Sequence, residues 1–217
     1  MSASKFCFDE EKLNVLRLKV QARLSPKRWI HTAEVEKMAA RLSELFCPQK
    51  KNLLRAAALL HDITKEWSVE KHCAFCPAHG IRLTDQDLFA HKTLHARTAA
   101  ALIPEEFAEF AAPELLSAVR WHTTGRANMT LSDKLIYLAD YIDESRAFPD
   151  CVALRNAFWS ADPQAMSYAD RKEHLRKILL RSFDMTISGL LADGLPVAQD
   201  TIKARNTLIL EGFRKKV

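Results

Sequence analysis

The chain has 217 residues, of which 48% are apolar and 27% are charged, values typical of a soluble globular protein with a full hydrophobic core. Only 5 glycines and 8 prolines are present, which argues against a turn-rich all-β fold. The net charge of +5 suits an anionic substrate such as a nucleotide, but it is too small to predict nucleic-acid binding.

Apolar residues recur at three- and four-residue spacing along most of the chain, which predicts α-helices. Ser25 is expected to cap a helix that Pro26 begins, and Thr84 and Ser132 are expected to cap two later ones. The last of these three helices is expected to end at Arg146–Pro149. The other expected helices cover residues 9–24, 25–46, 53–60, 67–80, 85–88, 93–102, 114–121, 150–159, 168–191 and 201–213.

No repeat, low-complexity segment or linker interrupts this pattern, and only Leu195–Val197 is expected to be extended. We therefore expect an all-α fold in which residues 1–217 form a single domain. Its core spans about 25–146, and the helices of about 150–214 form a C-terminal extension packed on that core.

A histidine and an aspartate, His61 and Asp62, stand side by side where the apolar run Leu59-Leu60 enters the core. Imidazole nitrogen and carboxylate oxygen both bind borderline cations, and a carboxylate can bridge two of them. Lys65 follows one helical turn after His61 and can place its ammonium group on a phosphate. The stretch predicts the centre of a metal-dependent phosphohydrolase.

Four more candidate residues lie at an end or on the inward side of expected helices: His31, His95, His122 and Asp140. With His61 and Asp62 they offer four imidazoles and two carboxylates from five helices, which is how helical bundles build metal sites. Mixed histidine and carboxylate ligands favour iron, manganese or zinc over magnesium or calcium, as one ion or two.

The ordered set and its flanking residues resemble the HD-domain superfamily of metal-dependent phosphohydrolases, and within it the symmetrical bis(5′-nucleosyl)-tetraphosphatase branch. The resemblance covers about residues 25–205 and implies an HD-domain helical bundle that uses iron to cleave diadenosine tetraphosphate to two ADP. The segments that carry it are Arg28–Thr32, Leu60–Lys65, His122–Arg126, Asp133–Ile142, Arg146–Pro149 and Thr201–Asn206.

The resemblance also implies roles for individual residues. It implies that the metal is bound by His31, His61, Asp62 and Asp140. It implies that catalysis involves Lys65, His95 and His122. It maps the nucleotide contacts onto Lys65, His95, His122, Thr123, Arg126, Tyr141 and Arg146. His95 and His122 can contact phosphate, protonate the leaving diphosphate or complete a second metal position. The segment from Trp67 to Leu88 matches no pattern of the branch.

The expected reaction is in-line attack of metal-activated water on one phosphorus of the tetraphosphate, with ADP as product and product inhibitor. Two alternatives stay open: another HD-type phosphohydrolase that acts on nucleoside mono- or triphosphates, and a non-catalytic nucleotide-binding module. An RNA-binding helical protein has only the mild charge in its favour. The expected partner is a nucleotide, with neither nucleic acid nor membrane, and a homodimer is compatible with the sequence.

Several candidates also have purely structural interpretations. His31 can be a core histidine bonded to a backbone carbonyl, and Lys65, Arg126 and Arg146 can be ordinary surface charges. Asp143 is expected to be solvated or paired with an arginine, and His174 to be solvated on a charged face.

The odd number of cysteines, five, the polar start Met1–Ser4 and the lack of a long apolar run predict a reducing cytoplasm, without signal peptide or membrane span. Cys73 and Cys76, near His72 and His79, form one pair only. A partly buried, reduced thiol pair is therefore favoured over a structural zinc site.

Overall fold

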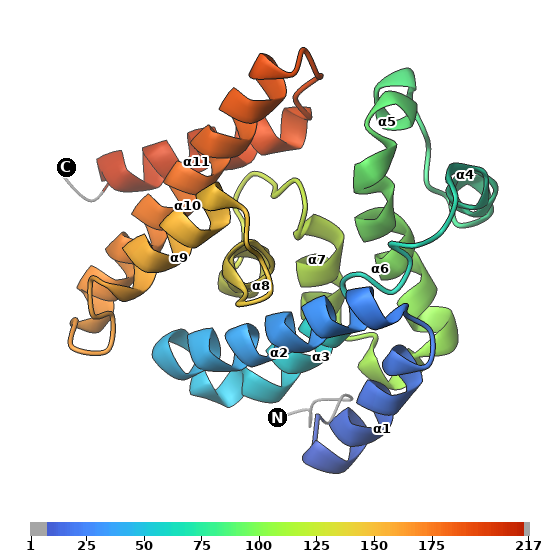
Figure 1. The fold of residues 1–217 in the computed structure, drawn as a ribbon, viewed down its shortest axis with the longest axis horizontal. Helices are drawn as coiled ribbons and strands as arrows, with labels where there is room; N and C mark the ends of the chain where they lie inside the picture. Colours follow the sequence, from blue (N-terminus) through green and yellow to red (C-terminus); the bar gives the residue numbers. More distant parts are fainter. Residues whose placement is uncertain (1–7, 215–217) are drawn as a thin grey trace.

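The computed structural model describes residues 8–214, so Cys7 and Met1–Ser4 lie outside the described residues. Within that range the chain forms α-helices, short 3₁₀ helices and loops, without a strand, which confirms the all-α prediction (Figure 1). The α-helices are α1 (Glu10–Gln21), α2 (Pro26–Phe46), α3 (Lys51–Leu60), α4 (Val69–Ala78), α5 (Asp85–Phe89), α6 (Leu94–Glu106), α7 (Pro113–Trp121), α8 (Leu131–Ile142), α9 (Pro149–Trp159), α10 (Tyr168–Ala192) and α11 (Gln199–Arg214). The 3₁₀ helices are η1 (Pro48–Lys50), η2 (His91–Thr93) and η3 (Ala108–Phe110).

The helix starts follow from local side-chain chemistry. Ser25 and Thr84 cap α2 and α5 as expected. The expected cap of α8 was wrong, because Thr130 rather than Ser132 occupies that position. The Thr130 hydroxyl accepts from the Asp133 N–H at 3.1 Å, and the Asp133 carboxylate accepts from the Thr130 N–H at 2.9 Å. This reciprocal pair satisfies two free backbone donors, which the Ser132 hydroxyl, bonded to a glutamate, does not.

The core of the bundle is built around α3, in which Leu54 and the run Ala56–Leu60 are buried. Helix α2 packs along α3 and against α8, and α7 packs on α3, α6 and α8. The buried interior includes Leu42 of α2, Leu59 of α3, Val119 of α7 and Leu135 of α8. Because α3 ends in the middle of this packing, its last turn delivers His61 and Asp62 to the interior.

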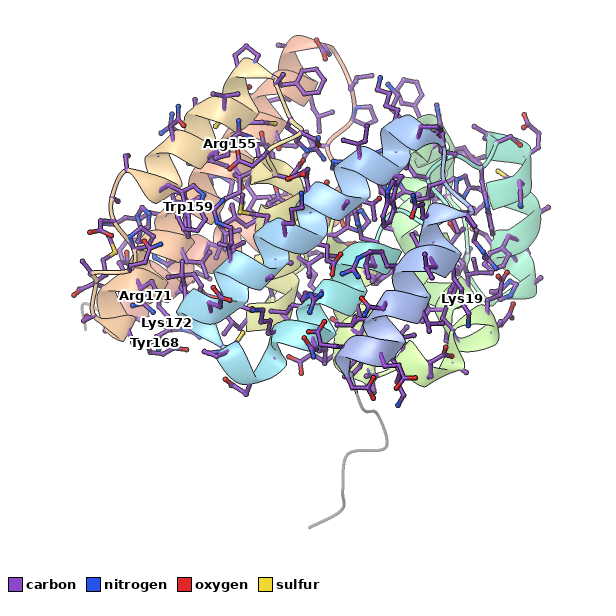
Figure 2. All side chains as sticks on the ribbon, turned by 60° about the horizontal axis from the view of Figure 1, so that its bottom comes forward. Lys19, Arg155, Trp159, Tyr168, Arg171 and Lys172 are labelled. Carbon is purple, nitrogen blue, oxygen red and sulfur yellow. The ribbon has the colours of Figure 1, made fainter. Side chains whose placement is uncertain are left out.

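The C-terminal helices α9, α10 and α11 pack beside α8 and form the other side of the molecule (Figure 1). Phe183 of α10 stacks on Tyr137 of α8 with ring centroids 4.5 Å apart. Arg171 donates to the Leu45 carbonyl, and it lies with Trp159 where α9 and α10 approach the end of α2 (Figure 2). No helix among residues 8–214 combines the length and the apolarity needed to cross a lipid bilayer.

Candidate metal centre

The structure brings six of the predicted site residues together at the meeting point of five helices. They are His31 from α2, His61 and Asp62 from the end of α3, His95 from the first turn of α6, His122 from the end of α7 and Asp140 from α8. His61, His95 and His122 are at most 2% exposed. Residues that are more than a hundred positions apart in sequence therefore share one buried site.

Three of the imidazoles are held by the same kind of backbone contact. Nδ1 of His61, His95 and His122 lies 2.6, 2.8 and 2.7 Å from the carbonyl oxygen three residues earlier. A carbonyl only accepts, so Nδ1 carries the proton and the lone pair of Nε2 points into the site. Histidines that ligate metals are commonly oriented in this way.

The first group of potential ligands is His31, His61 and Asp140, whose ligand atoms all lie within 4.8 Å of one another. Nε2 of His31 is 3.0 Å and Nε2 of His61 is 3.7 Å from Oδ1 of Asp140. Both nitrogens are buried and have no hydrogen-bond partner among the described residues. Unsatisfied buried nitrogens are costly, so two of them beside one carboxylate fit a bound divalent cation.

Asp62 lies between this group and the two remaining histidines. Its Oδ2 is 3.6 Å from Nε2 of His61, whereas its Oδ1 is 3.1 Å from Nε2 of His95 and 3.6 Å from that of His122. The two Nε2 atoms of His95 and His122 are 3.0 Å apart. Because their protons sit on Nδ1, two lone pairs face each other there, an arrangement that a shared cation or proton relieves. Lys65 Nζ, 3.2 Å from His95, is a nearby donor.

The electrostatics favour neutral imidazoles at His61 and His95 and charged carboxylates at Asp62 and Asp140. Burial lowers the pKa of His61 and of His95 to about 4. Burial acts in the opposite sense on the two aspartates, but His61 holds the pKa of Asp62 well below its usual value and Arg146 does the same for Asp140. Neutral imidazole and ionised carboxylate are the forms that bind metal.

His31 differs from the other histidines, because it faces two carboxylates. Burial lowers its pKa, but Asp140 and Asp143 together raise it to about 9. Asp143 is fully buried and lies 3.4 Å from His31 Nδ1 and 3.2 Å from Arg146 Nε. Asp143 is therefore paired with an arginine, one of its two expected states, and it also supports His31.

Two arginines face the carboxylates of the site. Arg28 donates to Oδ2 of Asp62 at 2.8 Å, and Arg146 donates to Oδ1 of Asp140 at 2.5 Å. Arg146 was a predicted site residue, whereas Arg28 had been given no role. Its position one helical turn before His31 is the signal that could have revealed it.

Three other predicted site residues make no hydrogen bond or ion pair with the six central residues in the described part of the chain. Arg126 donates to Oδ2 of Asp133 at 3.0 Å and so secures the start of α8. Tyr141 is partly buried and stacks on Tyr137 with ring centroids 6.3 Å apart. Thr123 has a buried hydroxyl without a hydrogen-bond partner among the described residues.

A buried polar chain behind His95 was not foreseen. His72 Nδ1 lies 3.0 Å from Thr98 Oγ1, which lies 2.9 Å from Thr64 Oγ1. The Thr64 hydroxyl in turn lies 2.9 Å from the His95 carbonyl. The sequence linked His72 only to the cysteine pair, but its imidazole is directed toward the support of His95.

The structure also tests the expectations for the cysteine segment and for His174. Cys76 is buried and Cys73 partly buried, both as free thiols, and the nearby His79 contacts Glu105 at 2.7 Å. His174 was expected to be solvated, which was wrong, because its ring stacks on Phe158 and Nε2 lies 3.0 Å from the Phe158 carbonyl.

The family model described as "HD domain" matches residues 28–145, the region that contains all six central residues. Two relatives named symmetrical bis(5′-nucleosyl)-tetraphosphatase, from Halalkalibacterium halodurans and Bacillus subtilis, are each 32% identical over 195 residues. In both cases the match covers 88% of this chain and 94% of the relative.

A solved structure from Clostridium acetobutylicum, described as a predicted HD superfamily hydrolase involved in NAD metabolism, is similar with a TM-score of 0.76 and 32% identity. That match covers 94% of this chain and 98% of the other. The match to the HD model, together with relatives aligned over nearly their whole length, confirms the resemblance seen in the sequence. The chain belongs to the HD-domain family and, within it, to the family of the symmetrical bis(5′-nucleosyl)-tetraphosphatases.

Proposed function

We propose that the protein is a metal-dependent hydrolase that cleaves diadenosine tetraphosphate, and related dinucleoside polyphosphates, symmetrically to two ADP. The observation that carries the proposal is the convergence of four imidazoles and two carboxylates in a chain whose relatives carry this enzyme's name. A mild positive charge agrees with a polyanionic substrate.

The metal would be held by His31, His61, Asp62 and Asp140, with iron as the proposed ion and manganese or zinc as alternatives. The position of Asp62 between the two groups of histidines supports two ions, with His95 and His122 serving the second. When bound, such a cation lowers the pKa of its water toward about 7 and neutralises phosphate charge.

The chain's own residues position the tetraphosphate and handle protons. Lys65 and Arg146 supply charge-assisted hydrogen bonds to phosphate oxygens at the edge of the cluster. Symmetric cleavage requires that each side of the scissile bond hold a nucleoside diphosphate. If only one ion is bound, a proton shared between the facing Nε2 atoms of His95 and His122, 3.0 Å apart, would be available to the leaving diphosphate. Thr123, Arg126 and Tyr141 stay predictions as nucleotide contacts, since none of them is bonded to the six central residues among residues 8–214.

The test is metal analysis of protein purified without oxygen, followed by identification of the products from diadenosine tetraphosphate. The expected result is bound iron and ADP as the only nucleotide product. His61→Ala and Asp62→Ala should lose both the metal and the activity. AMP and ATP as products, or preferred hydrolysis of a mono- or triphosphate, would instead support another HD-type phosphohydrolase.

ADP binding without turnover would support the non-catalytic nucleotide-binding module. A cytoplasmic location, the absence of nucleic-acid binding and a homodimer stay predictions. Size-exclusion chromatography with light scattering tests the last of these.

A further inference from the structure

A cavity of about 430 Å³ lies along the outer sides of α6 and α7, which pack against each other (Figure 1). The residues of these helices that line it are all outside the buried faces that pack into the core. Arg97 follows His95 by two positions, and Arg120 precedes His122 by two. Residues two apart on a helix do not share a face, so the two arginines lie on the side away from the metal centre. The cavity is therefore separate from the candidate site.

Arg120 carries the least compensated charge of this cavity. Its guanidinium lies over the ring of Trp121, 4.1 Å from the ring centroid, and makes no hydrogen bond or ion pair within residues 8–214. Burial and the neighbouring Arg97 lower the pKa of Arg120 to about 10, which still leaves it charged at neutral pH. A partly buried charge without a partner is costly, so this position fits a guanidinium that pairs with an external anion.

The carboxylates near these two arginines lie on their other side. Arg97 is held by Asp87, whose Oδ1 is 2.9 Å from Nη1, and it donates to the Arg82 carbonyl at 2.7 Å. Arg97 and Arg120 also line a second cavity of about 390 Å³ toward α5 and the start of α11, and Asp87 and Asp200 belong to the wall of that cavity. In the described part of the chain, no residue that lines the cavity along α6 and α7 carries a carboxylate. The positive charge on that side therefore suits an anionic ligand.

We propose that the cavity along α6 and α7 binds a phosphate group, either free phosphate or that of a phosphorylated small molecule, with Arg120 and Arg97 as its cationic contacts. Guanidinium groups bind phosphate through paired N–H bonds, and the apolar wall, which includes Leu116, lowers the local dielectric constant and strengthens the attraction. The volume falls within the range of about 300–1,000 Å³ that is usual for small-molecule sites. A phosphate bound there joins the outer sides of the two helices that deliver His95 and His122.

The test is isothermal titration calorimetry of inorganic phosphate into the metal-loaded full chain. Under the proposed function the metal centre also binds phosphate, so the wild type should show two sites. Arg120→Gln should weaken one of them about tenfold or more, the usual cost of losing a hydrogen bond between charged groups, and leave the other unchanged. Arg120→Lys keeps the charge but not the paired donors, and should weaken the same site less. If the metal centre binds no phosphate, the single remaining site should still depend on Arg120.

A matched control variant separates this site from a general effect of removing an arginine. Arg41 of α2 also lies 4.1 Å from the centroid of a tryptophan ring, that of Trp159, but it pairs with Glu144 at 3.4 Å. Arg41→Gln should therefore leave phosphate binding unchanged. Arg120→Gln removes an unpaired charge, so it should not lower the unfolding temperature in the absence of phosphate. That measurement shows that weaker binding does not come from misfolding.

Titration with ADP separates the two sources of the phosphate group. If Arg120→Gln weakens ADP at one site as it weakens phosphate, the site takes a phosphorylated small molecule. If phosphate binding depends on Arg120 and ADP binding does not, the site takes free phosphate. The inference is overturned if no phosphate site depends on Arg120, or if Arg41→Gln weakens phosphate binding as much as Arg120→Gln does.

Discussion

The HD core and the C-terminal helices contribute to the molecule in different ways. Helices α2, α3, α6, α7 and α8 supply all six residues of the candidate metal centre, whereas α9, α10 and α11 supply none of them. The C-terminal helices instead pack on α8 and on the loop after α7, through Phe183 and Ala204. The candidate metal centre and the helices that pack against its core therefore come from separate parts of the chain. Substitutions in each part can test that separation.

The largest effect is expected from Asp140→Asn, which keeps the side-chain volume but removes a candidate ligand charge. Metal content should fall, and hydrolysis should fall by about 10³-fold or more, while the protein stays folded. Inductively coupled plasma mass spectrometry and turnover measure the two quantities. Asp184→Asn is the matched control, because Asp184 also pairs with an arginine, Arg205 at 2.5 Å, but lies on α10. An equal loss of metal and of hydrolysis in both variants would contradict the conclusion that only the HD core carries the metal centre.

In the metal-stripped protein, the protonated His31 should make the free energy of unfolding depend on pH. Its folded-state pKa of about 9 exceeds the ordinary 6.5, so it contributes stability below about pH 6.5 that is lost as the pH rises through about 9. The contribution amounts to at most about 3 kcal/mol. Urea unfolding of wild type and His31→Gln at pH 6 and pH 9.5 measures it. The difference between the two proteins should shrink at the higher pH, and a constant difference would contradict the assignment.

The contact between core and C-terminal helices can be probed at Gly125, in the loop after α7. Its φ is +63°, and an added Cβ would lie 2.6 Å from Phe183 Cζ and 2.9 Å from Ala204 Cβ. Gly194 has a similar φ of +65° with nothing within 4 Å, so it isolates the conformational cost. We expect Gly125→Ala to lower the free energy of unfolding by about 2 kcal/mol and Gly194→Ala by about 1 kcal/mol. Equal losses would mean that the α10 and α11 contacts relax freely.

The smallest effect is expected behind His95. Thr98→Val keeps the shape but removes the hydroxyl that joins His72 to Thr64, and should cost about 1 kcal/mol and a few-fold in kcat. Thr207→Val on α11 removes a hydroxyl that bonds only to the backbone of its own helix. It should leave kcat unchanged. If both variants lose kcat equally, the chain behind His95 has no positioning role.

Local patterns in the sequence were enough to predict most of the helices and to identify the candidate metal ligands. The apolar stripes and the caps at Ser25 and Thr84 depend on residues three or four apart, so they can be read directly. The Thr130–Asp133 capping box was equally local and was overlooked in favour of Ser132. The His61-Asp62 pair and its neighbours pointed to the family because their order is itself a motif.

Contacts between segments that are distant in the sequence could not be predicted from local patterns. Arg28 meets Asp62 across 34 positions, and His72 meets Thr98 across 26. The exposed Phe148 looks in the sequence like one more core aromatic, because nothing local shows that its ring stays outside. These features depend on how the helices pack, and packing is a property of the whole chain.

The backbone contacts of His61, His95 and His122 have a consequence for engineering the ion preference of this protein. In many metalloproteins a separate side chain orients each imidazole and can be exchanged to adjust its basicity. Here the main chain takes that role, so it cannot be altered by substitution without bending a helix end. Attempts to redirect selectivity would have to act on the aspartates and on the arginines that face them.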